Sequence, residues 1–265
     1  MSHLERIISI IITLLLLLFL LLLSIFLSPN IIEHKEKEKE VVDESSYIGL
    51  KVIPNGDICF NSSDPSSYEK YIFELKQFIK PYEKINLGGK VINCDKQERE
   101  DDEICIIEKT WIYPCGNRDW GYSNGTPCII LYYSNDSNYR PIPYQSINDL
   151  PSEAPKELRN YLTEEVEQYG EFNSKLVYLY CTHAVYYDNY HPRGFYDFFF
   201  PTLNNVVDGY LPPIASVQFE FYEDYDYNDN LLEEEYRVEC SLWSKTPKTS
   251  KIKNVSFKIK HGNCE

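Results

Sequence analysis

Residues 236–242 read Tyr-Arg-Val-Glu-Cys-Ser-Leu, an uninterrupted alternation of apolar and polar side chains. A period of two is the pattern of a β-strand that buries one face and leaves the other in water. The same alternation occurs at Val217 to Phe221 and at Val255 to Ile259. We expect these three segments to form half-buried antiparallel strands.

Further strands and two helices are expected between these segments and the N-terminus. Apolar runs at Ile104 to Tyr113, Cys128 to Tyr133 and Leu176 to Val185 bring the expected strands to at least six, separated by turn-rich segments. Apolar residues fall at helical spacing in Ser67 to Tyr82 and again in Ser152 to Gln168. The sequence therefore predicts a mainly β fold, a β-sandwich with added helices.

The N-terminal region contains a long apolar stretch, from Ile7 to Leu27. As a helix it would span roughly 30 Å of hydrocarbon, whereas the apolar part of a cleaved signal peptide is only about 7 to 15 residues long. We therefore expect an uncleaved transmembrane anchor. The expected organisation is a cytoplasmic tail at 1–6, a transmembrane signal anchor at 7–27, a juxtamembrane stalk with an amphipathic helix at 28–82, and an extracellular domain at 83–265.

The cysteines and the glycosylation sequons indicate where the bulk of the chain resides. All 8 cysteines follow the apolar stretch. N-x-S/T sequons occur at Asn61, Asn124, Asn135 and Asn254. Both features suit an oxidising lumen, so we expect a single-pass type II protein of the plasma membrane with its C-terminus outside. Eight cysteines allow 105 pairings, although the separate strand patterns of Cys181 and Cys240 favour a bridge between two sheets.

Charge and motif spacing exclude several other functions. The formal net charge of -15 argues against a nucleic-acid partner. The G-x-S-x-G sequence at Gly121 to Gly125 leads into a strand-like segment, whereas the serine of a hydrolase elbow is followed by a helix. A calcium-loop spacing is followed by Asp224, Asp226, Asn228, Asn230 and Glu235, but Asp229 stands where glycine is needed, which favours a solvated hairpin over weak calcium binding. We expect no enzyme activity, no cofactor and no metal site.

Several ordered motifs are similar to a known family. Gly121-Tyr122 is followed by Gly125-Thr126-Pro127-Cys128 and an apolar strand, Tyr210 to Phe219 forms a second recognisable segment, and Arg237-Val238-Glu239-Cys240 lies downstream. Together they resemble the β subunits of the Na,K- and H,K-transporting P-type ATPases. The expected fold class is therefore mainly β: an immunoglobulin-like antiparallel β-sandwich ectodomain with added helices, preceded by a single transmembrane helix.

The resemblance also implies disulfides and a partner. It implies the bridges Cys94 with Cys105, Cys115 with Cys128 and Cys181 with Cys240, and we add as a hypothesis a fourth bridge between the remaining Cys59 and Cys264. It implies a non-catalytic subunit that assists folding, trafficking and potassium handling of a catalytic α subunit in the membrane. The residues expected to face that α subunit are Phe195, Tyr196, Phe198, Phe199, Phe200, Tyr210, Leu211, Gln218 and Phe219.

Two alternatives remain open from the sequence. Any of these aromatic residues can instead belong to the hydrophobic core. The chain can also be a β-like cell-surface glycoprotein of adhesion or junction assembly. Its apolar stretch at residues 7–27 is nearly all Leu and Ile, and Ser9, Thr13 and Ser24 are the few small residues there that could help helices to pack in a bilayer.

Overall fold

The computed structural model describes residues 16–18, 49–83, 90–94, 96–100, 103–107, 112–134, 140–187, 193–200, 210–221, 234–245 and 254–264. The chain divides into two compact units, Met1–Ser45 and Ser46–Glu265. In the first unit the described residues 16–18 are helical. Most of the expected membrane span at 7–27 thus lies outside the described residues, and within the described ranges no helix is long and apolar enough to cross a bilayer.

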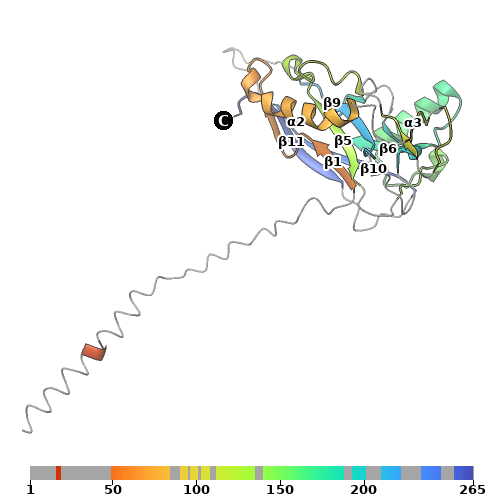
Figure 1. The fold of residues 1–265 in the computed structure, drawn as a ribbon. Coiled ribbons are helices and arrows are strands. Elements are labelled where there is room, and N and C mark those ends of the chain that lie inside the picture. Colours follow the sequence, from red (N-terminus) through yellow and green to blue (C-terminus); the bar gives the residue numbers. More distant parts are fainter. Residues whose placement is uncertain are drawn as a thin grey trace, which may run out of the picture. The chain divides into compact units, whose positions relative to one another are not determined.

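Two sheets form the body of the second unit (Figure 1). The strands of the four-stranded sheet follow the order β1 (Gly49–Ile53), β5 (Cys128–Ser134), β9 (Ile214–Gln218) and β7 (Tyr186–Tyr187). Those of the five-stranded sheet follow the order β2 (Ile58–Phe60), β11 (Val255–His261), β10 (Glu234–Trp243), β6 (Leu176–Cys181) and β8 (Gly194–Tyr196). A small sheet joins β3 (Lys90–Ile92) to β4 (Glu103–Cys105). The prediction of a mainly β fold with a few helices is confirmed.

Two details of the strand predictions need correction. Most strand pairs are antiparallel, but β2 runs parallel to β11 and β3 runs parallel to β4. Among the described residues of the expected strand at Ile104 to Tyr113, Ile104 and Cys105 belong to β4, whereas the buried Ile112 lies in a turn outside any strand. An apolar run alone cannot show which of its residues are strand.

The main core lies between the inner faces of the two large sheets. Phe219, which follows β9, meets Phe257 of β11 edge to face, with ring centroids 6.3 Å apart. Val177 and Leu179 of β6 belong to the same buried cluster. Face-to-face packing of two sheets through interdigitating apolar side chains defines a β-sandwich.

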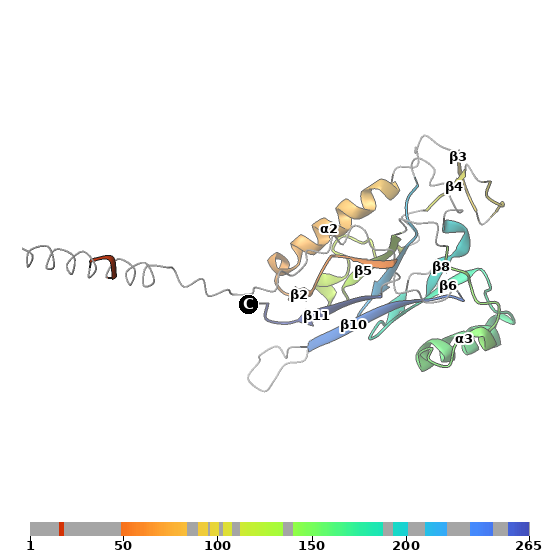
Figure 2. The same cartoon turned by 90° about the horizontal axis from the view of Figure 1, so that it is seen from below.

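Helix α2 (Glu69–Ile79) covers the outer face of the four-stranded sheet (Figure 2). Its Leu75 is fully buried, and its Phe78 packs on Tyr132 of β5 with ring centroids 4.9 Å apart. This confirms the amphipathic helix predicted near Ser67 to Tyr82, whose last part is the 3-10 turn Lys80–Glu83. Because β5 is covered on both faces, it reads as a continuous apolar run instead of an alternation.

The second predicted helix forms α3 (Lys156–Tyr169) and covers the outer face of β6. Leu158 and Leu162 are fully buried in a second cluster that includes Leu176 and Tyr178 of β6. Odd and even residues of β6 therefore enter different cores. One of them is shared with the opposite sheet, and the other lies under α3.

Buried tyrosines predict loss of stability in alkali. Burial raises the pKa of Tyr144 to about 12 and raises those of Tyr82 and Tyr122 well above their ordinary value of 10.0. Unfolded tyrosines ionise near pH 10, so the stability gained by keeping these phenols neutral is present below pH 10 and falls as the pH rises toward 12. We expect the β-sheet circular dichroism and the 295 nm phenolate absorbance to change together in that range. Ionisation of all 23 tyrosines near pH 10 with an unchanged β-sheet signal would contradict this.

Candidate docking surface

The aromatic segment from Gly194 to Phe200 divides into an inner and an outer set of side chains. It consists of β8 and the 3-10 turn Asp197–Phe199. Tyr196 and Phe198 are half-buried, and their rings stack with centroids 5.1 Å apart and an interplanar angle of 6°. This stacked pair offers a flat aromatic contact at the protein surface, the kind of group that is enriched in interface cores.

Two arginines and one backbone hydrogen bond hold this segment in place. Arg140 donates from Nη2 to the carbonyl oxygen of Asp197 at 3.0 Å and to its Oδ2 at 3.3 Å. Arg99 donates from Nη2 to the carbonyl oxygen of Phe200 at 2.9 Å, and the N–H of Asp197 donates to the carbonyl oxygen of Lys175 at 2.8 Å. Burial raises the pKa of the Asp197 carboxyl, while the Arg140 guanidinium opposes that rise. These hydrogen bonds fix the backbone that carries the stacked rings of Tyr196 and Phe198.

The start of the β9 region lies against the same segment. The Tyr210 hydroxyl donates to the carbonyl oxygen of Phe199 at 3.2 Å, and burial raises the pKa of that phenol. Leu211 is half-buried and packs against the main core. The structure thus joins Tyr210 to the aromatic segment 11 positions earlier in the chain, and Leu211 is the next residue after Tyr210.

Four residues expected to face a partner are core residues. Phe195, Phe199, Phe200 and Phe219 are buried, with exposed fractions of 0%, 2%, 0% and 0%. A fully buried ring has no surface left for a partner to contact, so the expectation is corrected for these four positions. The alternative that these aromatic residues belong to the hydrophobic core is correct for these four.

Gln218 is separated from the other surface residues. It ends β9, at the opposite end from Leu211, and donates from Nε2 to the carbonyl oxygen of Thr126 at 3.0 Å. The candidate docking surface is therefore Tyr196, Phe198, Tyr210 and Leu211. Sequence reasoning missed Arg99 and Arg140, because nothing in the pattern around either arginine distinguishes it from the other basic residues.

Four disulfides join the eight cysteines. The structure pairs Cys94 with Cys105, Cys115 with Cys128, Cys181 with Cys240 and Cys59 with Cys264, the same pairs that were expected.

The bridge of Cys181 and Cys240 does not join two sheets. These residues face each other directly across β6 and β10 of one sheet, with Cα atoms 4.1 Å apart. The expectation of an inter-sheet bridge is wrong, because alternation shows that a residue is in a strand but not which strand is its neighbour.

The sequons differ in accessibility. Asn124 and Asn254 are exposed. Asn61 is half-buried, and its Oδ1 accepts the N–H of Ser63 at 3.0 Å. Asn135 lies outside the described residues. Glycan occupancy at these positions stays a prediction.

The G-x-S-x-G sequence forms a structural turn. Gly121 and Gly125 flank the 3-10 turn Tyr122–Asn124 with φ values of 81° and 69°, and the chain then enters β5. Ser123 is exposed and its hydroxyl donates to Asp119 Oδ2. The turn places the fully buried Tyr122 against Phe60, with ring centroids 5.3 Å apart. This geometry anchors a core tyrosine and differs from the strand, serine and helix order of a hydrolase elbow.

The metal expectations are tested only in part. The calcium-like spacing from Asp224 to Glu235 lies mostly outside the described residues. In the ranges that the structure covers, no group of three or more His, Cys, Asp or Glu side chains is placed to hold a metal ion.

A β-sandwich stapled by four disulfides is typical of domains that fold in oxidising compartments. The chain matches the family model described as sodium / potassium ATPase beta chain over residues 8–259, which is most of its length. The chain belongs to this family.

Individual relatives are distant. The chain is 26% identical over 203 residues to sodium/potassium-transporting ATPase subunit beta-2 of Drosophila melanogaster. This alignment covers 69% of this chain and 62% of the fly protein. It is 22% identical over 212 residues to subunit beta-233 of Anguilla anguilla, covering 71% and 64% of the two chains. It is 27% identical over 123 residues to subunit beta-1 of Tetronarce californica, covering 40% of each. The chain therefore spans less than two thirds of the length of these relatives.

Proposed function

We propose that the chain is the non-catalytic β subunit of a Na+/K+-type transporting ATPase and that it assists the folding, trafficking and potassium handling of the catalytic α subunit. The observation that carries this proposal is the family match over residues 8–259. The four disulfides add support, because such bridges persist in oxidising compartments outside the cytosol.

The proposed topology is single-pass type II at the plasma membrane. Residues 1–6 would lie in the cytoplasm, residues 7–27 would span the bilayer, and the C-terminus would be extracellular. The apolar character of residues 7–27 and the position of all cysteines after them support this orientation. Protease accessibility of a C-terminal tag on intact cells tests it, and protection of that tag would contradict it.

The proposed contact with the α subunit is the stacked pair Tyr196 and Phe198, extended by Leu211. These side chains lie on a backbone fixed by Arg140 and Arg99, so little conformational entropy is lost when a partner binds. Two chains anchored in one membrane also meet at high effective concentration, so a small aromatic patch can suffice.

Affinity capture of the tagged full chain from native membranes tests the function. We expect a P-type ATPase α chain to be recovered, and we expect the double variant Tyr196→Ala/Phe198→Ala to recover several-fold less of it. The matched control is Phe73→Ala, which removes an aromatic ring that is 65% exposed on α2, away from the docking surface.

Each outcome of this capture has a definite meaning. Consistent absence of an α chain from the wild-type capture would reject the pump subunit and favour the adhesion protein. Unchanged recovery with the double variant would keep the subunit but remove the stacked pair from the contact. A non-reducing gel that shows the same disulfide-bonded form for each variant verifies that the ectodomain is intact.

A further inference from the structure

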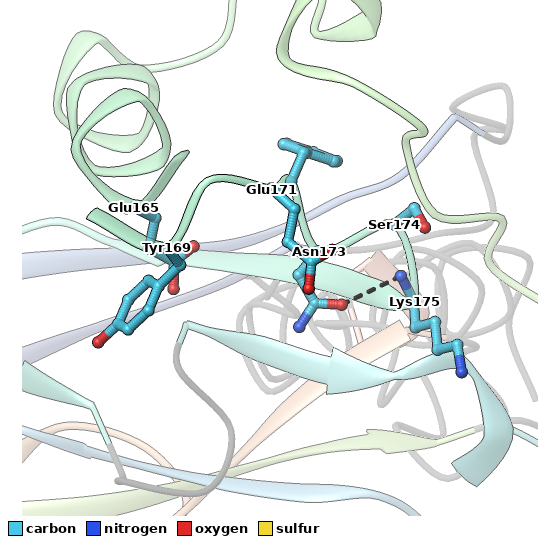
Figure 3. A pocket seen from close by; sticks show the side chains of 7 residues that line it. Glu165, Tyr169, Glu171, Asn173, Ser174 and Lys175 are labelled. Carbon is cyan, nitrogen blue, oxygen red and sulfur yellow. Dashed lines mark hydrogen bonds between the residues drawn. The ribbon is translucent and has the colours of Figure 1, made fainter. Parts of the chain in front are cut away.

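An open pocket of about 500 Å³ lies where the C-terminal end of α3 meets the segment leading into β6 (Figure 3). Glu165 and Tyr169 of α3 line one side, and residues Glu171 to Lys175 line the other. None of these side chains belongs to the docking surface described above. The pocket therefore needs an explanation of its own.

Asn173 is held so that its amide nitrogen is available. Its Oδ1 accepts the N–H of Lys175 at 3.2 Å, and its carbonyl oxygen accepts the Tyr178 hydroxyl at 3.0 Å. In Figure 3 the amide nitrogen points away from Lys175. Because Oδ1 is engaged, the group that Asn173 presents to a ligand is its N–H donor.

Glu165 is held as an acceptor on the opposite side. Its Oε1 accepts the Tyr161 hydroxyl at 2.7 Å, and the Tyr161 ring lies under the Arg193 guanidinium at 4.3 Å. Burial raises the pKa of Glu165, while the hydrogen bond from Tyr161 and the charge of Arg193 oppose this. The carboxylate is therefore in place before any ligand arrives, which lowers the entropy cost of binding.

The pocket also has an apolar component. The side chain of Tyr169 is 69% exposed at the rim. Phe172 packs against Tyr178 with ring centroids 5.6 Å apart, which fixes its position in the lining. An exposed phenol ring offers a flat apolar face beside a polar edge.

These groups match a ligand with both hydroxyl groups and an apolar face. The lining supplies donors from Asn173 and Lys175 and acceptors from Glu165 and Glu171. Two carboxylates against one ammonium group disfavour a phosphate or another anion. A pyranose ring has hydroxyl groups around its edge and C–H groups on its faces, so it can use all of these groups together. We propose that this pocket binds a neutral sugar residue of a glycan.

Saturation-transfer NMR on the full chain in detergent micelles, with its own glycans trimmed, tests the proposal. The probes are N,N′-diacetylchitobiose and lactose. We expect one of them to bind weakly, with a Kd on the order of 1 mM. Tyr169→Ala should weaken binding about tenfold or more, which is at least about 1.4 kcal/mol, while Tyr169→Phe keeps the ring and should retain binding. Phe73→Ala, a distant exposed ring, should have no effect.

Three results would overturn the sugar site. They are no binding of either saccharide, equal binding by wild type and Tyr169→Ala, and binding of Nα-acetyl-lysine methyl ester in place of the sugars. The proposal does not depend on the pump partner, because we expect capture of an α chain to be unaffected by Tyr169→Ala.

Discussion

Replacing Gly121 by Ala is expected to lower the free energy of unfolding by at least about 4 kcal/mol, the range reached only by severe core or backbone defects. Gly121 has a φ of 81°, and an added Cβ would overlap the carbonyl oxygen of Thr126. That oxygen cannot move freely, since it accepts the Gln218 amide at 3.0 Å. The variant has to open the turn that places Tyr122 in the core.

Gly56→Ala is the matched control for this substitution. Gly56 has a nearly equal φ of 84°, but no atom lies within 4 Å of the position that a Cβ would take. Its cost should be limited to the left-handed backbone conformation, about 1–2 kcal/mol. Urea unfolding of the full chain in detergent, followed by tryptophan fluorescence, measures both variants. Similar losses for the two would show that the contact with Thr126 is unimportant.

Removing the bridge between Cys59 and Cys264 is expected to cost more than removing the bridge between Cys94 and Cys105. The first bridge closes a sequence separation of 205 residues and the second closes one of 11. The loss of chain entropy in the unfolded state gives about 5 kcal/mol for the long loop and about 3 kcal/mol for the short one. The double variants Cys59→Ala/Cys264→Ala and Cys94→Ala/Cys105→Ala test this order.

The measurement is the urea midpoint of each double variant relative to wild type, under non-reducing conditions. Cys105 is buried, whereas Cys264 is exposed, so lost packing works against the predicted order and makes the test stringent. A larger loss for the short loop would mean that local packing outweighs the entropy of the long loop.

The sequence predicted those parts of the fold that face water on one side. Strand β10 carries exposed Arg237 and Glu239 between buried Val238 and Cys240, so its alternation is visible. In β6 every residue except Tyr180 is buried, because α3 covers the face that would otherwise be exposed. The apolar run of β6 predicts a strand, but it does not predict which helix or sheet covers each face of that strand. For this reason the sequence could not place Cys181 and Cys240 side by side in one sheet.

The docking surface was predictable only as a region. Residues 195–200 read Phe-Tyr-Asp-Phe-Phe-Phe, which follows neither a period of two nor a helical period. Which rings turn inward is decided by the short strand β8, the 3-10 turn after it, and the hydrogen bonds from Arg140 and Arg99. Arg140 and Arg99 are about 60 and 100 positions away in the chain from the residues they bind, and no local sequence pattern predicts these hydrogen bonds.

The position of β11 between β2 and β10 has a consequence for biosynthesis. Strand β2 is synthesised early, yet its hydrogen-bonding neighbour in the described sheet is β11, and its residue Cys59 is bridged to Cys264, which is synthesised much later. A nascent chain that has emerged only as far as β10 lacks the strand that pairs with both β2 and β10, and it lacks the partner of Cys59. Strand β2 and its cysteine therefore reach their native pairing only after residues 255–264 have been made.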